Sequence, residues 1–190
     1  MKNFKTIAIA LVVALGTLTA SAQNGTKKVD ASKSKITWVG KKVTGSHEGT
    51  VNLKEGSLIF KKDVLAGGNF TIDMTTISST DLTGEYKGKL DGHLKADDFF
   101  GTDKFPTAKL VFKKIATKSK GNYTVTADLT IKGITKPVTF DIATTATTAT
   151  SSFKINRTVY GIKYNSGSFF DSLGDKTIND DFDVTVALQF

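Results

Sequence analysis

The sequence contains no cysteine, and this absence removes several kinds of chemistry together. Disulfide bonds, thiolate metal sites, cysteine nucleophiles and a lipidated N-terminal cysteine are all excluded. Arginine is nearly absent as well, because Arg157 is the single arginine among 26 basic residues. Nucleic-acid sites usually depend on arginine forks, and the lysines here are scattered along the chain. We therefore expect no nucleic-acid partner, and we interpret the formal net charge of +8 as surface charge.

Histidines are equally scarce, since His47 and His93 are the only two. A metal site would need both of them with carboxylates, or one with several acids, and Asp97 lies four residues after His93. The sequence has no Gly-x-Ser-x-Gly elbow, no phosphate-binding glycine loop and no zinc-type histidine spacing. We interpret the adjacent acids at 97–98 and 180–181 as a helix end and a turn. No metal, cofactor or catalytic residue is therefore predicted.

Long apolar runs are missing too, except for one near the N-terminus that has the pattern of a signal peptide. Lys2 and Lys5 precede an apolar run from Ile7 to Leu18, which ends in Ala20-Ser21-Ala22. A core of about 12 residues is too short to anchor a chain in a hydrocarbon layer of about 30 Å. We predict that residues 1–22 are cleaved, leaving one soluble domain from Gln23 that is periplasmic or secreted.

Most of the remaining chain alternates apolar and polar residues with period two, which is typical of strands with one buried face. Gly67 and Gly68 predict a turn before one of these strands, and Gly121-Asn122 predicts a hairpin. The run of Thr, Ala and Ser from Thr144 to Ser152 predicts a solvated edge or hairpin end, or alternatively a flexible rim. Strands are predicted over 35–43, 50–53, 57–61, 70–74, 108–112, 123–131, 138–142 and 182–190.

One segment, residues 82–100, has a helical pattern instead. Leu82, Tyr86, Leu90 and Leu94 fall four residues apart, which predicts a helix with one apolar stripe, and Pro106 prevents its continuation. About eight strands and one helix leave a closed antiparallel barrel or a two-sheet sandwich. Closure is favoured because the apolar last strand would otherwise be an aggregation-prone edge. The prediction is an all-β, eight-stranded antiparallel barrel with one short helical segment.

Two motifs carry a resemblance to a known family. The first is His93-Leu94-Lys95-Ala96-Asp97-Asp98-Phe99-Phe100 with Phe105-Pro106, and the second runs from Gly121-Asn122-Tyr123 through Asp128-Leu129-Thr130-Ile131-Lys132-Gly133-Ile134-Thr135-Lys136-Pro137-Val138. Together with Trp38, Gly45 to Gly49, Ile155 to Arg157, and Tyr160-Gly161, they resemble the YceI-like family of exported polyisoprenoid-binding proteins over Val29 to Phe190. Some positions depart from the family pattern: Ala96 replaces a usual Ser, Gly101 a frequent Asp, and Lys95 and Lys132 common arginines.

The resemblance implies an extended, lipocalin-like barrel whose apolar interior holds a long isoprenoid chain, with the head group near the mouth. It supplies no catalytic residues. His47 shares strand parity with Val51 and Leu53, which predicts an inward side chain unless a bulge interrupts the strand. The aromatic residues fit either a packed core or a lipid-binding surface. The predicted ligand-binding residues are Arg157, His47, Trp38, Phe99, Phe100, His93 and Phe140.

Arg157 needs a partner if its strand is regular. A strand from Phe153 would place the guanidinium in an apolar row, and burying it alone is unfavourable by several kcal/mol. The partner can be a carboxylate, a set of carbonyls, or the head group of a ligand. We expect an internal partner, with Asp141, Asp128 and Asp183 as the candidate acids, and a head-group clamp is the alternative.

The expected function is therefore an exported carrier of a long isoprenoid lipid, such as a polyprenyl diphosphate or an isoprenoid quinone. Two other functions stay open: a structural or stress-response barrel with a filled core, and an enzyme that modifies a lipid, such as a hydrolase or isomerase. An apolar cavity without paired polar groups would argue against the enzyme. The carrier would have no transmembrane segment, would contact a membrane surface transiently, and would be a monomer or homodimer.

Overall fold

A computed structural model describes residues 25–190, so the predicted signal peptide and the start at Gln23 lie outside the described part. Within residues 25–190 the chain forms nine strands, one α-helix and two short 3-10 helices. No helix within residues 25–190 is long and apolar enough to cross a bilayer. The elements are β1 (Gly25–Lys28), β2 (Lys35–Lys42), β3 (Gly45–Lys61), β4 (Val64–Ser79), α1 (Gly84–Lys95), β5 (Thr107–Ser119), β6 (Asn122–Ile131), β7 (Ile134–Thr144), β8 (Thr148–Asn156), η1 (Thr158–Tyr160), η2 (Gly174–Lys176) and β9 (Asp181–Gln189).

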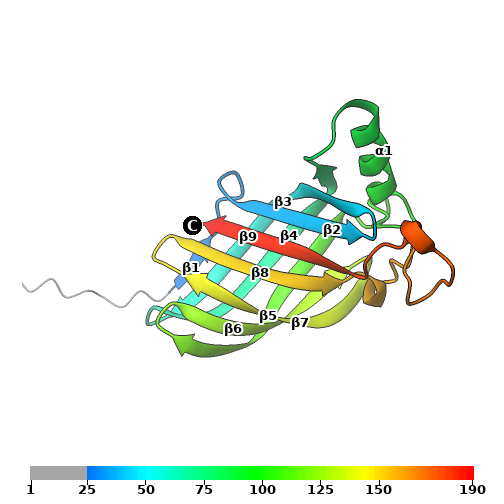
Figure 1. The fold of residues 1–190 in the computed structure, drawn as a ribbon. Helices are drawn as coiled ribbons and strands as arrows, with labels where there is room; N and C mark the ends of the chain where they lie inside the picture. Colours follow the sequence, from blue (N-terminus) through cyan, green and yellow to red (C-terminus); the bar gives the residue numbers. More distant parts are fainter. Residues whose placement is uncertain (1–24) are drawn as a thin grey trace, which may run out of the picture.

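Eight of the strands form a closed antiparallel barrel, as predicted (Figure 1). Each strand from β2 to β9 pairs with the next strand in the sequence, and β9 returns to pair with β2. The closing contact runs from Lys35 opposite Ala187 to Val39 opposite Asp183. The short β1 adds to the far half of β3. The apolar C-terminal strand therefore has a neighbour on both sides.

Two of the predicted strands are parts of one long strand, β3. The pairing of β3 with β4 shifts register three times, between Thr50 and Asn52 among other places, so the apolar period is interrupted. The turn predicted at Gly67-Gly68 is wrong, because both glycines lie inside β4. The chain turns instead at Lys62 and Asp63, which have φ values of 50° and 62°. Short polar side chains tolerate this left-handed region better than most, but lysine is an uncommon choice.

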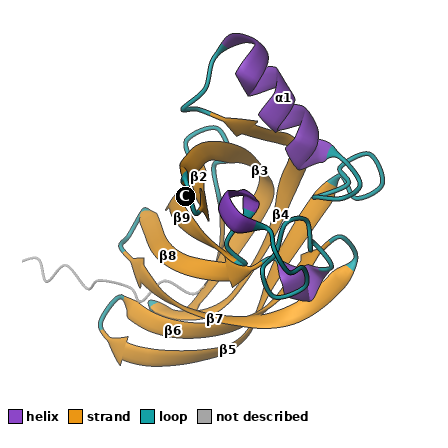
Figure 2. Cartoon of the chain, turned by 45° about the vertical axis from the view of Figure 1, so that its right-hand side comes forward, coloured by secondary structure: helices purple, strands orange, loops and turns teal. Residues whose placement is uncertain are grey.

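The connections at the two ends of the barrel differ greatly in length. Because neighbouring strands are antiparallel, every second connection lies at the same end. One end has short connections, such as the turn at Lys62–Asp63. The other carries α1 and both 3-10 helices, within the long connections 80–106 and 157–180 (Figure 2). We call this second end the α1 end.

Helix α1 is shorter than the predicted segment of 82–100 and is not covered along one full face. It begins at Gly84 and ends at Lys95, and the residues up to Phe100 form turns. Leu94 is buried against the barrel, but Tyr86 is 74% exposed. The predicted apolar stripe is therefore wrong at Tyr86, whereas Leu90 and Leu94 pack against the core.

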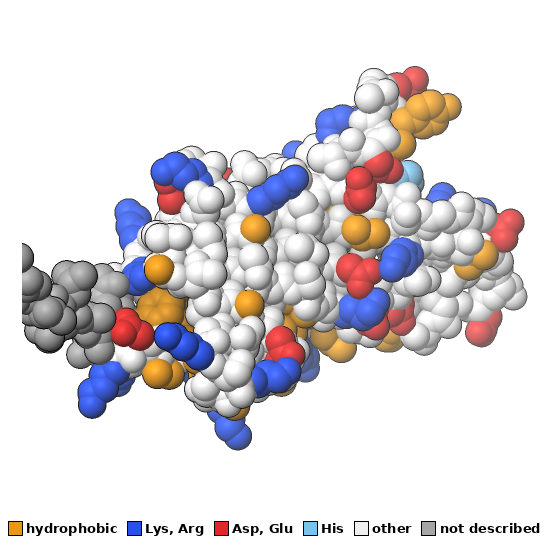
Figure 3. All heavy atoms as spheres, turned by 60° about the vertical axis from the view of Figure 1, so that its left-hand side comes forward, with side chains coloured by type: hydrophobic (Ala, Val, Ile, Leu, Met, Phe, Trp, Pro, Cys, Tyr) orange, Lys and Arg blue, Asp and Glu red, His pale blue; other side chains and the backbone are white. Residues whose placement is uncertain are grey.

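The interior is packed solidly at the end opposite α1. Leu58, Phe60 and Leu65 are buried there with Tyr123, whose hydroxyl accepts a hydrogen bond from the Leu65 N–H at 3.2 Å. The outer wall is mostly polar, and threonine pairs bridge adjacent strands, for example Thr130 and Thr135 at 2.8 Å between their hydroxyl oxygens. Figure 3 shows one face of the wall, with scattered charged side chains and small, separated apolar ones.

Candidate functional site

The interior of the barrel contains a cavity of about 180 Å³. Every strand from β2 to β9 contributes to its wall. The connections at the α1 end contribute Leu94, Phe99, Phe100, Arg157 and Ile178, whereas none of the tight turns at the opposite end does. The cavity therefore extends from the packed end of the barrel towards the α1 end.

The lining of the cavity is almost entirely apolar. Several inward-facing side chains are only partly buried, which shows that the barrel is not filled by its own residues. A row of four phenylalanines crosses the wall, with ring centroids 5.6 Å apart for Phe70 and Phe112, 5.9 Å for Phe112 and Phe140, and 4.6 Å for Phe140 and Phe153. The partly buried lining residues are Val51, Ile72, Leu110, Phe112, Phe153, Phe182 and Val186.

Among the described residues, Arg157 is the one charged side chain in this lining, and it is only 2% exposed. Its guanidinium donates hydrogen bonds to three backbone carbonyls: Nε to Asn179 at 3.0 Å, Nη1 to Ile162 at 2.9 Å and Nη2 to Ile178 at 2.9 Å. β8 ends at Asn156, so Arg157 begins a turn rather than continuing the strand. An internal partner was expected, and the set of carbonyls provides it.

The carboxylate nearest Arg157 is Asp180, with Oδ1 3.7 Å from Nη2. Asp141, Asp128 and Asp183 were the wrong candidates, because they pair with lysines on the outer wall. Partial burial raises the pKa of Asp180, but hydrogen bonds from Ser166 and Ser168 and the charge of Arg157 outweigh it, so this pKa lies below its usual value. The cavity is thus bordered by a charge-balanced pair.

The α1 end of the cavity is bordered by a cluster of rings. His93 lies 5.3 Å from Phe99 and 4.4 Å from Tyr164 between ring centroids, and Phe99 lies 5.4 Å from Phe100. The Nε2 atom of His93 is buried and has no hydrogen-bond partner among residues 25–190. Asp97 does not approach it, since that carboxylate pairs with Lys104 at 2.5 Å. His93 therefore packs among aromatic rings at the C-terminal end of α1.

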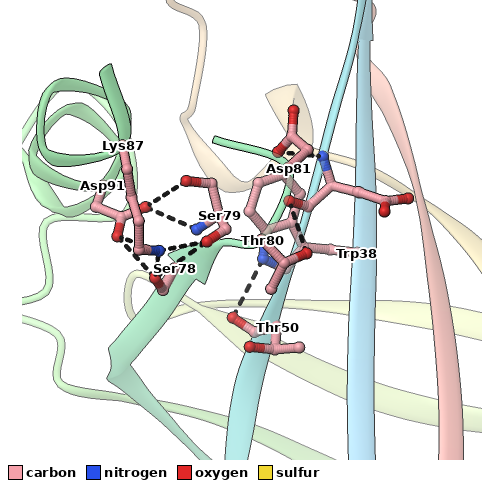
Figure 4. A network of polar contacts seen from close by, with 9 residues as sticks. Trp38, Thr50, Ser78, Ser79, Thr80, Asp81, Lys87 and Asp91 are labelled. Carbon is pink, nitrogen blue, oxygen red and sulfur yellow. Dashed lines mark hydrogen bonds and ion pairs between the residues drawn. The ribbon is translucent and has the colours of Figure 1, made fainter. Parts of the chain in front are cut away.

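A polar network fixes α1 to the end of β4 (Figure 4). The Asp91 carboxylate accepts hydrogen bonds from the Ser78 hydroxyl at 2.7 Å and from the Ser79 N–H at 2.7 Å, and it pairs with Lys87 at 3.1 Å. Lys87 also donates to the Ser79 carbonyl. Burial of the Asp91 carboxyl raises its pKa, but these hydrogen bonds outweigh burial and lower the pKa from 3.8 to about 2. The network holds Leu94 over the cavity.

Comparison with known proteins places this arrangement in a family. The protein-family model described as the YceI-like domain matches residues 28–190. The chain belongs to the YceI-like family. Among curated relatives, a UPF0312 protein of Shewanella denitrificans is 36% identical over 91 residues, which cover 48% of this chain and 46% of that protein. One of Vibrio parahaemolyticus is 29% identical over 138 residues, covering 71% and 68%. The matched segment thus spans under half the length of the Shewanella protein.

Solved structures share the same fold. BcnA of Burkholderia cenocepacia superposes with a TM-score of 0.67 at 23% identity, over 85% of this chain and 99% of BcnA. A polyisoprenoid binding domain of Saccharophagus degradans, described as implicated in plant cell wall breakdown, gives a TM-score of 0.62 at 15% identity, over 88% and 98%. At these identities the likeness establishes the barrel alone.

Five of the seven residues predicted to bind ligand line the cavity of this YceI-like domain. They are Trp38, Phe99, Phe100, Phe140 and Arg157. Their part in binding stays a prediction.

The two histidines among the predicted residues lie elsewhere. His93 sits in the ring cluster beside the cavity. The inward orientation predicted for His47 does not bring it to the cavity either, since its Nδ1 lies 2.8 Å from the Asp81 carboxylate near the β2–β3 turn.

Sequence reasoning missed several lining residues. Phe112, Phe153 and Phe182 follow the same inward alternation as Phe140, so the strand pattern contained a signal for them. Ile178 and Asn179 belong to a loop, and no periodicity marks them.

Proposed function

We propose that this YceI-like protein binds a long isoprenoid lipid in the barrel cavity and carries it outside the cytoplasm. The observation that carries the proposal is a cavity of about 180 Å³ whose lining contains one charged side chain. Each methylene that leaves water for such a surface contributes about 0.8 kcal/mol to binding, before ordering is subtracted. The similar domain of Saccharophagus degradans, described as polyisoprenoid binding, supports the same class of ligand.

The charges around the cavity favour a neutral head group, as in an isoprenoid quinone, over a polyprenyl diphosphate. A diphosphate carries several negative charges, and burying them requires unpaired cations. Arg157 is the single cation that residues 25–190 contribute to the lining, and Asp180 and three carbonyls already engage it. A guanidinium has five N–H donors, so two are left for uncharged acceptors such as quinone carbonyls.

The cavity also supports binding rather than catalysis. Its lining includes no Asp, Glu or His among the described residues, so no acid-base pair faces the ligand space. The Ser-Lys-Asp group around Asp91 fixes α1 to β4 and lies outside the cavity lining. A lipid-modifying enzyme would need such groups at the reacting bond.

Native mass spectrometry of freshly purified protein, followed by organic extraction, tests the proposal. We expect a retained isoprenoid with a neutral head group. Leu110 and Val111 offer a matched pair of variants, because Leu110 lines the cavity and Val111 faces outward on the same strand. Leu110→Trp should lower lipid occupancy, and Val111→Trp should leave it unchanged. Extracts without isoprenoid would refute the carrier, and recovery of a diphosphate would refute the head-group class.

Export is the second part of the proposal, and it depends on the N-terminal pattern. The expected mature chain begins at Gln23, directly after Ala20-Ser21-Ala22. The intact mass of protein recovered from the periplasm or medium measures this directly. A recovered species that retains the apolar run from Ile7 to Leu18 would indicate an anchored protein and would contradict a freely diffusing carrier.

A further inference from the structure

Exposed apolar side chains gather at the α1 end of the barrel. Nine large apolar side chains are exposed within residues 25–190. Val64, beside a tight turn of the opposite end, and Val111, in the middle of β5, are the exceptions. The seven at the α1 end are Val43, Tyr86, Ile134, Val159, Tyr164, Phe169 and Phe170. A cluster of exposed apolar side chains on an otherwise polar surface indicates a site of interaction with a protein, a membrane or a ligand.

The loop that presents the two phenylalanines is fixed by hydrogen bonds. Buried Ser166 accepts from the N–H groups of Phe169 and Phe170 through its carbonyl, at 3.1 and 3.0 Å. The Ser168 hydroxyl donates to Asp180 at 2.6 Å, and Asp180 in turn lies beside Arg157 at the cavity. Both rings are thus held about half-exposed, at 48% and 50%, and close to the cavity border.

The charges on this loop cancel. Between η1 and β9 its exposed charged residues are Lys163 and Lys176 against Asp171 and Asp175. The Lys163 ammonium lies over the Phe169 ring, 4.3 Å from its centroid, so this cation already has a partner. A strongly anionic surface would gain little here beyond what the overall positive charge of the chain supplies. A surface of neutral, zwitterionic head groups matches this loop better.

We propose that the α1 end docks onto a zwitterionic lipid bilayer through Phe169, Phe170, Tyr164 and Val159. Aromatic side chains favour the boundary between head groups and hydrocarbon, and the rings here would enter it beside the cavity. Lipid would then pass between bilayer and barrel with little exposure to water. This inference rests on the proposed lipid-binding function and adds the place where the lipid is exchanged.

Co-sedimentation of the mature chain with phosphatidylcholine vesicles tests the docking surface. We expect binding that persists in about 0.5 M salt, because salt does not screen apolar contacts. Phe169→Ser with Phe170→Ser should weaken partitioning about tenfold or more, because two half-exposed rings are lost. Circular dichroism and thermal unfolding of the double variant verify that it folds.

Two valines provide the matched control, because both are 46% exposed and they lie at opposite ends of the barrel. Val159→Ser should weaken vesicle binding measurably, whereas Val64→Ser should not. Equal effects of the two variants would overturn the proposal. So would binding that requires anionic phosphatidylglycerol and disappears in salt, since that outcome indicates adsorption by the positive chain.

A second assay separates docking from ligand binding. Trp38 is the one tryptophan of the chain and lines the cavity, so quenching of its fluorescence reports a bound quinone. Quinone added in ethanol measures binding, and quinone added in vesicles measures transfer. The Phe169→Ser, Phe170→Ser variant should bind quinone from ethanol as the parent does, but it should take up quinone from vesicles more slowly.

Each failure has its own signature. Vesicle binding without quenching by quinone from ethanol would refute the carrier and leave the docking surface intact. Quenching without vesicle binding would refute docking alone. A dimer that the double variant converts to a monomer, with no binding to vesicles, would assign the surface to a second copy of the chain and overturn the proposal.

Discussion

Replacing Arg157 by lysine should destabilise the barrel strongly, even though the charge is kept. The planar guanidinium reaches three carbonyls in different directions, on Ile162, Ile178 and Asn179. A lysine ammonium is a compact donor on a flexible stem, and it can satisfy one of these carbonyls well. The other two would be left in a buried position without a partner.

The magnitude follows from those two lost contacts. A hydrogen bond to a charged group contributes about 1.5–3 kcal/mol, and a buried acceptor without a donor costs about 1–3 kcal/mol. Local rearrangement recovers part of this, so we expect a loss of about 3 kcal/mol in the free energy of unfolding. For a domain of this size, such a loss lowers Tm by about 6–12 °C.

Thermal and urea unfolding of Arg157→Lys, with and without bound lipid, measure the effect. A structural role predicts the same loss of Tm in both states. A variant within about 2 °C of the parent in both states would show that the three carbonyl contacts contribute little. Unchanged stability together with lost lipid occupancy would instead identify Arg157 as a head-group clamp and refute the structural role.

Two further predictions concern β3 and α1. Gly49→Ala should destabilise the barrel by about 3 kcal/mol or more, as measured by urea unfolding. The added Cβ would lie 2.1 Å from the Ser78 carbonyl oxygen and 2.4 Å from the Trp38 ring. A loss of stability below about 1 kcal/mol would contradict this packing. Asp91 has a pKa lowered to about 2, so its contribution of about 2 kcal/mol is complete above pH 4 or so and is lost as the pH falls towards 2. The difference in Tm between the parent and Asp91→Asn should therefore shrink between pH 5 and pH 2, and a constant difference would contradict the assignment.

The sequence predicted best those strands whose pairing is regular. β6 and β7 pair without a bulge, and Tyr123, Val125 and Ala127 alternate inward as expected. β3 and β4 were predicted only in fragments, since their register shifts interrupt the alternation. Gly67 and Gly68 were wrongly predicted as a turn, because glycine has no side chain and so adds nothing to the apolar-polar alternation that identifies a strand. There the side chains of Ile59 and Phe112 lie against them.

The candidate site divides in the same way. Inward phenylalanines could be predicted by parity, because they lie on strands. The surroundings of Arg157 could not be predicted, since its partners are backbone carbonyls near the two ends of the connection 157–180. Every residue has a backbone carbonyl, so residue types do not reveal which ones become partners. The turn predicted at 180–181 is only partly correct, because Asp181 already begins β9. The closeness of Asp180 to Arg157 depends on how the connection 157–180 folds back.

The order of pairing in the barrel has a consequence for how the chain folds. Each pair of neighbouring strands from β2 to β9 is also adjacent in sequence, so most of the sheet can grow by successive hairpins. The exception joins Lys35–Val39 to Asp183–Ala187, which are separated by nearly the whole domain. Closing so large a loop is entropically unfavourable. The pairing of β2 with β9 that compensates for it can form only after the last strand is available. Until then the growing sheet has two open edges and an uncovered apolar face, so a chain that emerges from its N-terminus first needs protection from aggregation until β9 is available.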